Sequence, residues 1–332
     1  MFGRSRQAPC KSPPQRLLQV LLMASACLGF GAQAAYPDRP IRLIVPWAAG
    51  GSTDALARAV AQHMSETLGQ SVVVDNRSGG SGRIGTEAAA KAAPDGYTIA
   101  IVELPHAIAP AVFIKMPYDL LRDFTPVSLL GTSPLMLFVN ASQYRGGIED
   151  YLKDGRTSAA PLALAHSGNG TISHLAGELF AGATRVKLNP IPYRGSAPAL
   201  VDVAAGLVSG HFSTLASGAP LLNTGKISAL MVTGSSRAAA LPKVPTAAEV
   251  GIPGMAFSQW WALVAPAATP TDIVQRLNKE VAAALAHPAT RDRLTTLGIE
   301  VKGSTPGELR SFMHSEVVHW ADVVRKAGIS PE

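Results

Sequence analysis

The chain alternates short apolar runs, glycine-rich polar turns and amphipathic stretches over most of its length. Ile41–Val45 is predicted to be a buried strand, residues 49–51 a tight turn, and residues 55–68 an alanine-rich helix that closes at Gly69. Residues 52–54 are all types that cap helix N-termini, so we expect the helix to begin among them. The stretch therefore predicts a strand, a glycine turn and a helix N-terminus in succession.

The same alternation continues toward the C-terminus. Residues 104–125 are rich in proline and turn-forming types and are predicted to be irregular. Residues 129–139 are predicted to form two strand-like runs broken at residues 131–134, and a helix is expected after the connector at residues 242–246. Further strands are predicted at residues 72–74, 97–102, 162–165, 188–191, 212–215, 229–232 and 257–264, and helices at residues 84–92, 148–153, 197–205, 271–286, 289–297 and 306–327, with one more through His174 and Phe180.

Strands that alternate with helices predict parallel sheets with right-handed crossovers. Two strand-like crossings, near residues 125–139 and 257–264, bracket the middle third of the chain. A chain that leaves one α/β lobe, builds a second and returns gives two lobes joined by two crossover strands, with a cleft between them. We therefore predict a two-lobed α/β fold, in which residues 1–34 are a leader, residues 35–132 and 259–332 form one lobe, and residues 133–258 form the other.

The leader has the three parts of a secretory signal peptide. A basic segment precedes an apolar run at residues 17–30, and Ala32-Gln33-Ala34 matches a small–x–small cleavage site. An uncleaved membrane anchor is the alternative, although the run is short for a bilayer span. A lipoprotein signal at Cys27 is disfavoured by Ala24, where a large aliphatic residue is expected. We therefore expect an exported, soluble protein.

Removal of this segment changes both the charge and the cysteine content. Of 29 basic residues, four lie in residues 1–34, which hold no acid, so 25 remain against 23 acidic residues and the formal charge falls from +6 to +2. Nucleic-acid binding then has no compositional support. Both cysteines, Cys10 and Cys27, lie in the leader, which excludes disulfides, thiolate metal sites and a cysteine nucleophile from the mature chain.

Four turns that lead from a strand to a helix carry the candidate binding chemistry. They lie at residues 49–53, 79–82, 167–171 and 195–196. Free N–H groups at a helix N-terminus favour an anion, and glycines let the backbone approach it closely. A plain strand-to-helix connection explains any single turn equally well. If the four share the cleft, they predict a site for a small anion.

Motifs of catalysis and metal binding are absent from the sequence. No serine lies in G-x-S-x-G, no H-E-x-x-H occurs, and the acidic residues lack EF-hand spacing. We interpret His106 and His174 as hydrogen-bonded structural residues, and Asp54 as a charge at a helix N-terminus rather than a base. No catalytic residue, metal or cofactor is therefore predicted.

One stretch keeps an enzymatic alternative open. Residues 80–85 match G-x-G-x-x-G before a helix, and Glu103 ends the next strand, which is the outline of a dinucleotide fingerprint. Polar residues 75–79 separate the strand from the first glycine, and export argues against a supply of nicotinamide cofactor. A nucleotide-dependent oxidoreductase that uses residues Gly80 to Gly85 is the alternative interpretation.

Eight stretches of the mature part match a known family in their order along the chain. They are YPDRPIRLIVPWAAGGSTD, LGQSVVVDNRSGGSGRIG, AAPDGYTI, MPYDLLRDFTPVSLL, HSGNGTISHLAGE, IPYRGSAPALVD, LPKVPTAAEVGIPG and WWALVAPAATP. In these stretches the sequence resembles the Bug (TctC-like) family, the periplasmic solute receptors of tripartite tricarboxylate transporters. The resemblance implies a type II periplasmic-binding-protein fold that closes on a carboxylate-bearing metabolite and delivers it to a membrane permease, without enzymatic activity. We expect a monomer in the periplasm.

The resemblance also implies which residues bind the carboxylate, mainly through backbone N–H groups and bridging water. In family members that bind amino acids, an acidic residue is expected near residues 211–215, which here offer only hydroxyls and a histidine. The ligand is therefore predicted to be a carboxylate without an amine. A carboxylate sensor that signals to a membrane protein is a further alternative. The implied ligand-binding residues are Trp47, Ala49, Gly50, Gly51, Ser52, Thr53, Gly79, Gly80, Ser81, Ser167, Gly168, Asn169, Gly170, Thr171, Gly195, Ser196, Asp202 and Ser213.

Overall fold

The computed structural model describes residues 1–3, 5, 36–327, 329 and 331. The chain divides into two units, Met1–Asp38 and Arg39–Glu332, and the helices and strands of the described residues lie in the second. The predicted cleavage site and apolar run of the leader lie outside the described residues. No helix in the described part of the chain has the length and apolar character needed to cross a bilayer.

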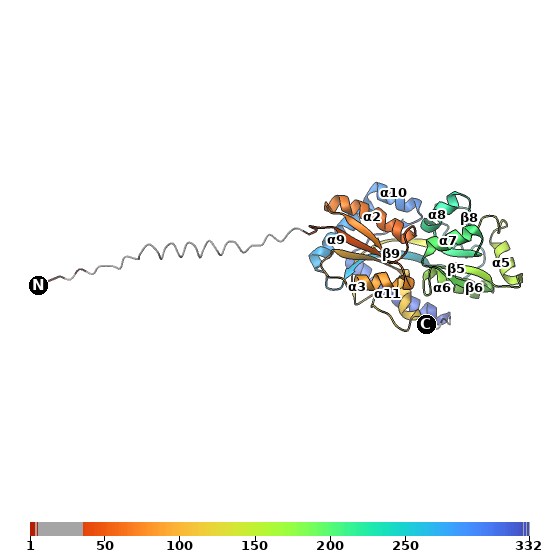
Figure 1. The fold of residues 1–332 in the computed structure, drawn as a ribbon, viewed down its shortest axis with the longest axis horizontal. Coiled ribbons are helices and arrows are strands. Elements are labelled where there is room, and N and C mark those ends of the chain that lie inside the picture. Colours follow the sequence, from red (N-terminus) through yellow and green to blue (C-terminus); the bar gives the residue numbers. More distant parts are fainter. Residues whose placement is uncertain (4, 6–35, 328, 330, 332) are drawn as a thin grey trace. The chain divides into compact units, whose positions relative to one another are not determined.

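The first lobe is built on a sheet whose strands come from both ends of the second unit. β1 (Ile41–Val45) lies between β2 (Val72–Asn76) and β3 (Thr98–Glu103) and pairs with both in parallel, while β9 (Ser258–Pro266) runs antiparallel to β3. The parallel strands confirm the prediction from the strand–helix alternation. The helices of this lobe are α2 (Ser52–Leu68), α3 (Arg83–Ala90), α4 (Leu104–Val112), α9 (Thr271–Ala286), α10 (Pro288–Thr296) and α11 (Pro306–Lys326), with a 3₁₀ turn, η2 (Gly80–Gly82) (Figure 1).

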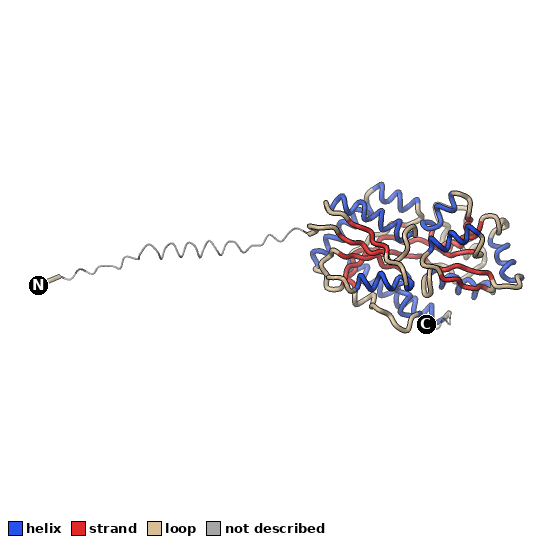
Figure 2. The backbone as a smooth tube through the Cα atoms, in the orientation of Figure 1, coloured by secondary structure: helices blue, strands red, loops and turns tan. Residues whose placement is uncertain are grey.

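The second lobe repeats this arrangement on a second sheet. β5 (Leu162–His166) pairs in parallel with β6 (Leu188–Pro192) and β7 (Gly210–Thr214). Figure 2 shows helices on both sides of the strands in both lobes, so the central strands are apolar because both of their faces are covered. The remaining elements of this lobe are β8 (Ile227–Val232), α5 (Ile148–Thr157), α6 (Ile172–Thr184), α7 (Ser196–Ala205) and α8 (Leu215–Asn223).

One long strand connects the two sheets. β4 (Phe124–Asn140) is hydrogen-bonded to β9 in the first sheet and to β7 and β8 in the second. The prediction of two runs broken at residues 131–134 is therefore wrong. Gly131 faces β10 (Glu300–Val301), where a Cβ would lie 2.8 Å from the Glu300 carbonyl oxygen, so the glycine admits a neighbouring strand. The pairing of β4 with β9 shifts in register between Pro126 and Ser128 and again between Leu129 and Gly131, and these shifts let the strand continue through its proline and glycine residues.

The second predicted crossover strand, unlike the first, does not connect the two sheets. β9 is paired with β3 and β4 in the first sheet, so the chain returns from the second lobe through residues 233–257. The helix expected after residue 246 is a series of turns. The residue boundaries of the two lobes stay a prediction.

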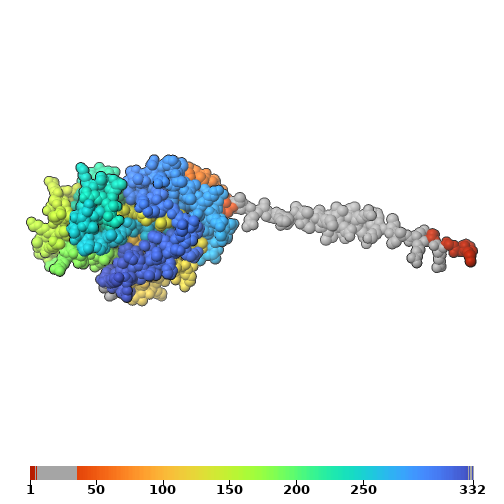
Figure 3. Space-filling view, turned by 180° about the vertical axis from the view of Figure 1, so that it is seen from behind, coloured from red at the N-terminus to blue at the C-terminus, as the bar shows by residue number. Residues whose placement is uncertain are grey.

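The stretch predicted to be irregular after β3 contains helix α4. Pro105 lies in its first turn, where proline is tolerated, and Glu103 and His106 form a capping box at its start. Most of the helix is buried, because α11 packs over it, and the helix therefore lacks the polar face by which periodicity reveals a helix. α11, dark blue in Figure 3, forms part of the rear face of this unit.

Candidate functional site

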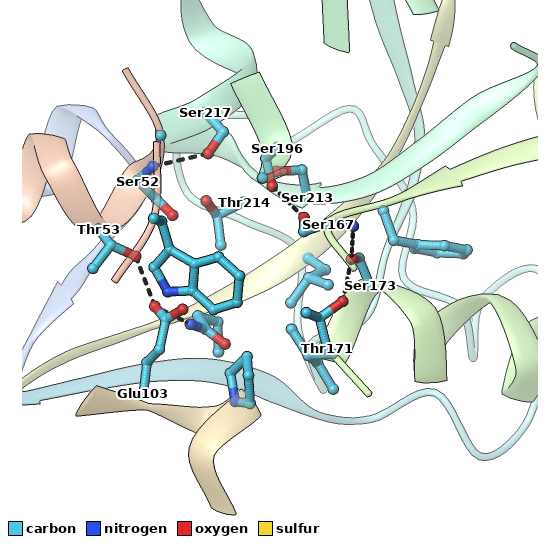
Figure 4. A pocket seen from close by; sticks show the side chains of 18 of the residues that line it. Ser52, Thr53, Glu103, Ser167, Thr171, Ser173, Ser196, Ser213, Thr214 and Ser217 are labelled. Carbon is cyan, nitrogen blue, oxygen red and sulfur yellow. Dashed lines mark hydrogen bonds between the residues drawn. The ribbon is translucent and has the colours of Figure 1, made fainter. Parts of the chain in front are cut away.

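A pocket lies between the two lobes, where strands of both sheets end. We call it the inner pocket. It offers about 60 Å³ to the centres of water-sized molecules, several times the ~10–15 Å³ that one water needs. Its apolar walls are Pro105, Leu135, Ile172 and Phe212, and its hydroxyls come from Ser52, Thr53, Ser167, Thr171, Ser173, Ser196, Ser213, Thr214 and Ser217 (Figure 4).

Five helices begin at this pocket. The residues at their N-caps, which all line it, are Gly51 for α2, Glu103 for α4, Thr171 for α6, Gly195 for α7 and Thr214 for α8. Of these, only Glu103 forms a capping box with its own helix. The N-termini of the other four helices direct their partial positive charge toward the cavity without a side-chain cap. The site thus favours negative charge without a cationic side chain among its lining residues.

On the second lobe the hydroxyls are joined to one another. The Ser167 and Ser196 hydroxyl oxygens are 2.9 Å apart, and the Ser167 backbone N–H donates to the Ser173 hydroxyl at 2.9 Å. The Thr171 hydroxyl lies 3.0 Å from Ser173 and donates to the Gly168 carbonyl. Figure 4 shows this group on one side of the pocket. It is a neutral surface that can donate hydrogen bonds.

On the first lobe the pocket contains a buried carboxyl group. The Oε2 atom of Glu103 accepts hydrogen bonds from the Thr53 hydroxyl and from the Gln259 side-chain amide, both at 2.7 Å. The Thr53 oxygen in turn accepts a hydrogen bond from the Trp261 indole N–H at 3.0 Å. Burial raises the pKa of Glu103 to about 7, against the opposite effect of the neighbouring Thr53, Gln259, Trp261 and Trp47 side chains.

Three buried polar atoms on the pocket wall have no hydrogen-bond partner. They are the Trp47 indole Nε1, the Thr214 hydroxyl and the Gln259 Oε1 atom. An indole N–H only donates and an amide oxygen only accepts. Leaving such groups unpaired costs about 1–3 kcal/mol each. A ligand that accepts from Trp47 and donates to Gln259 removes part of this cost.

The lobes contact each other across the cleft. The Ser52 backbone N–H, on α2, donates to the Ser217 hydroxyl, on α8, at 2.9 Å. A Cβ at Gly168 would lie 2.6 Å from the Ser81 hydroxyl of the opposite lobe, which leaves no room for a side chain. The structure is therefore a closed form of the cleft.

The predicted binding residues fall into three groups: those that line the inner pocket, those that line an outer pocket, and those that line neither. A second, outer pocket shares Trp47 and Ser167 with the inner one. Asp202 is turned to the Tyr193 hydroxyl, which donates to it at 2.6 Å. The inner pocket takes Trp47, Gly51, Ser52, Thr53, Ser167, Thr171, Gly195, Ser196 and Ser213; the outer pocket takes Gly79, Gly80, Ser81, Gly168 and Asn169; and Ala49, Gly50, Gly170 and Asp202 line neither.

Close packing, and not pocket lining, explains the glycine at position 170. A Cβ there would lie 2.4 Å from the Val112 side chain, so the residue is small because α4 approaches it. Gly170 is predicted as a binding residue by its glycine turn and by the resemblance, and Asp202 by the resemblance alone. Neither residue lines the inner or the outer pocket, and their part in ligand binding stays a prediction.

Several residues of the inner pocket were missed as ligand-binding candidates. Glu103 ends a parallel strand, the place where ligands bind in such sheets, so its position was a usable signal. Gln259 lies on the antiparallel strand β9 and reaches the pocket only because β9 pairs with β3 and β4. Nothing local in the sequence marks it. Glu103 gives the inner pocket an acidic side chain, although residues 211–215 supply none.

The histidine and aspartate interpretations agree with the geometry. His106 bonds to the Thr86 hydroxyl at 2.8 Å and to the Glu103 backbone, and burial lowers its pKa to about 4, so it is a neutral cap. Burial raises the pKa of Asp54, but hydrogen bonds from Arg58 and from the Gly50 N–H outweigh it and hold the pKa below its ordinary value. No cluster among the described residues is suited to hold a metal.

The dinucleotide fingerprint is split by the fold. Gly80 lines the outer pocket and Glu103 the inner one. Gly85 packs where a Cβ would lie 2.6 Å from the Arg77 carbonyl oxygen and 2.9 Å from Pro46, so close packing of α3 explains it. The two parts of the motif therefore do not form one nucleotide site.

The two lobes, each with a mainly parallel sheet, and the hydroxyl-lined cleft between them define a periplasmic solute-binding protein. The solved structure of the periplasmic binding protein BugD is 34% identical in sequence and superposes with a TM-score of 0.86. The match covers 90% of this chain and 100% of the BugD chain. A model of the tripartite tricarboxylate transporter family receptor, TctC, matches residues 56–329, and the chain belongs to this family. BugT of Bordetella pertussis is 36% identical over 318 residues, which are 94% of this chain and 98% of BugT.

Two similar structures contain carboxylates. Rpa4515 of R. palustris, solved with adipate, is 38% identical, with a TM-score of 0.86 over 90% of this chain and all of its own. MatC (Rpa3494) from Rhodopseudomonas palustris, solved with bound malate, is 34% identical, with a TM-score of 0.83 over 87% of this chain and all of its own.

Proposed function

We propose that this protein captures a small carboxylate in the inner pocket and presents it to the membrane permease of a tripartite tricarboxylate transporter. The observation that carries the proposal is the convergence of helix N-termini on one pocket together with the unpartnered Trp47 N–H. Helix N-termini and a buried N–H donor bind an anion without a basic residue. The carboxylates bound to two similar proteins support the same ligand class.

The family supplies the rest of the proposal. A receptor of this kind works outside the cytoplasm, which accords with a signal peptide at residues 1–34, and its partner is a permease in the membrane. The protein acts as a monomer, without a cofactor and without catalysis. Ligand closes the lobes, since both walls of the pocket contribute binding groups.

Calorimetric titration of the exported chain tests this function. We expect small carboxylates to bind and to raise the melting temperature, whereas the matching primary amides do neither. Trp47→Phe removes the indole N–H and should weaken binding at least about 10-fold, the value of one hydrogen bond to a charged group. Trp320→Phe is the matched control, because that buried indole bonds Glu316 outside the pocket.

Two outcomes would overturn the proposal. One is that no carboxylate in a panel of mono-, di- and tricarboxylates binds or stabilises the protein. The other is that Trp47→Phe binds as tightly as Trp320→Phe. Reconstitution with the transporter's permease, in which uptake depends on the receptor, tests the partnership separately.

A further inference from the structure

The inner pocket holds an acid although its helix N-termini favour anions. Glu103 is 3% exposed and lines the cavity. Three donors hold its carboxyl group in place: the Thr53 hydroxyl, the Gln259 amide and a backbone N–H of α4 in the capping box. The Thr53 proton is committed to Glu103, because the Thr53 oxygen already accepts from the Trp261 indole. This arrangement presents Glu103 as an acceptor.

Among the described residues that line the inner pocket, no Lys or Arg pairs with Glu103. On α4, His106 is neutral because burial lowers its pKa to about 4. On α2, Asp54 forms an ion pair with Arg58. On β1, Arg42 donates to the Thr98 hydroxyl. β9 carries no titratable side chain over Ser258–Pro266. An anionic end of a ligand placed here would meet an acid without a compensating charge.

Gln259 adds a second acceptor at the same end of the pocket. Its amide nitrogen donates to Glu103, and its buried Oε1 atom has no hydrogen-bond partner. A buried acceptor without a donor is costly. The first-lobe wall therefore places two acceptor groups, Glu103 and Gln259, in the same pocket as the unpartnered N–H of Trp47.

We propose that Glu103 and Gln259 form an acceptor subsite that binds a hydroxyl or ammonium group of the ligand. The ligand is then an organic acid that carries a hydrogen-bond donor, and its carboxylate lies toward Trp47 and the helix N-termini. This inference rests on the proposed function and names the ligand class within it. It widens the ligand class predicted from residues 211–215, which are acids without an amine, to include acids that carry an ammonium group.

The test uses two matched series of ligands. Propionate, lactate and alanine share three carbons and one carboxylate, and succinate, malate and aspartate share four carbons and two carboxylates. Within each series the second member adds a hydroxyl and the third an ammonium group. We expect the best donor-bearing member to bind at least about 10-fold tighter than its parent acid in one series. Its affinity should hold or rise from pH 6 to pH 8.

The matched variants locate the effect. Glu103→Gln should reduce that preference about 10-fold or more for an ammonium ligand, and Gln259→Leu should reduce it for a hydroxyl ligand. Glu280→Gln, at a buried acid that pairs with Arg276 on α9, should leave it unchanged. Circular dichroism of each variant establishes that it is folded.

The outcomes separate the two proposals. If no acid of either series, or of the wider carboxylate panel, binds, the proposed function fails. If acids bind but the parent acids bind as tightly as the donor-bearing ones, only the acceptor subsite is overturned. It is also overturned if succinate binds best and gains affinity as the pH falls below 7, because Glu103 would then act as a protonated donor.

Discussion

The two walls of the inner pocket are built in opposite ways. On the first lobe, Thr53, Glu103, Gln259 and Trp261 form one buried network in which almost every polar atom is already committed. On the second lobe, the hydroxyls around Ser167 come from separate turns and helix starts. The first wall is organised by hydrogen bonds to a buried carboxyl group, and the second by hydrogen bonds among neutral hydroxyls.

The difference bears on stability and binding separately. A change in the first wall leaves buried groups unpaired, so its cost falls on folding as well as on ligand affinity. A change in the second wall exchanges one neutral hydroxyl among many, so it falls mainly on the ligand. Substitutions chosen from each wall therefore test whether the division of roles is real.

The largest effect is expected from Thr53→Val. The substitution removes the hydroxyl that links the Trp261 indole to Glu103, which leaves the Trp261 N–H unpaired in the interior and takes one donor away from the buried carboxyl group. We expect a loss of about 4 kcal/mol in the free energy of unfolding, measured with urea. Thr53→Ser keeps the hydroxyl and should lose about 1 kcal/mol. Equal losses for the two variants would contradict the network.

The pH dependence of folding isolates Glu103. Its pKa is about 7 in the folded chain against an ordinary value of 4.5, so between these values the folded state keeps a proton that the unfolded state has released. Stability from this group is full below about pH 4.5 and is lost as the pH rises to 7. The advantage of the wild type over Glu103→Gln should fall by about 3 kcal/mol over that range.

Two buried histidines change the pH dependence of stability in the direction opposite to that of Glu103. Burial lowers the pKa of His106 and of His211 to about 4, so their contribution rises with pH up to about 6.5. Both are present in the wild type and in Glu103→Gln, so the difference between the two proteins removes them. Urea unfolding of the ligand-free proteins at pH 5 and pH 8 measures the difference in the free energy of unfolding between the wild type and Glu103→Gln. If this difference is the same at both pH values, Glu103 is ionised throughout the range.

Ser196→Asp probes the second wall. The residue is the first of α7, where a carboxylate is favourable for the helix, so the fold should keep its melting temperature. The new charge competes with the ligand's carboxylate and should weaken binding about 100-fold, roughly 3 kcal/mol. Ser196→Asn is the neutral control. If both variants bind alike in calorimetry, the carboxylate lies elsewhere.

The smallest effect concerns closure between the walls. Ser217→Ala removes the acceptor of the Ser52 N–H across the cleft and should cost about 1 kcal/mol of the closed form, or about 5-fold in affinity. Ser209→Ala removes a hydroxyl within the second lobe alone and should leave affinity unchanged. Tryptophan fluorescence during titration reports closure for both variants. Equal affinity of the Ser217→Ala and Ser209→Ala variants would argue against a contribution of the Ser52–Ser217 hydrogen bond to closure.

Local signals in the sequence determined most elements and the anion-favouring turns. Period-two and helical patterns, glycines after strands and cap residues act over a few neighbours, so β1, α2 and the turn before α6 follow from their own residues. The strand-like crossings on either side of the middle third predicted the two-lobed fold, and the resemblance of scattered motifs implied the same fold. Elements buried on all sides, such as α4, lack the polar face that local patterns require.

Tertiary structure alone decided which residues share the pocket. Gln259 reaches Glu103 over 156 residues of sequence because β9 inserts between β3 and β4, and Ser217 meets Ser52 because the lobes close. The same packing turned Asp202 to Tyr193 and left it out of the pocket. Strand order and lobe closure bring distant residues together, and no interaction between neighbours along the chain encodes that proximity.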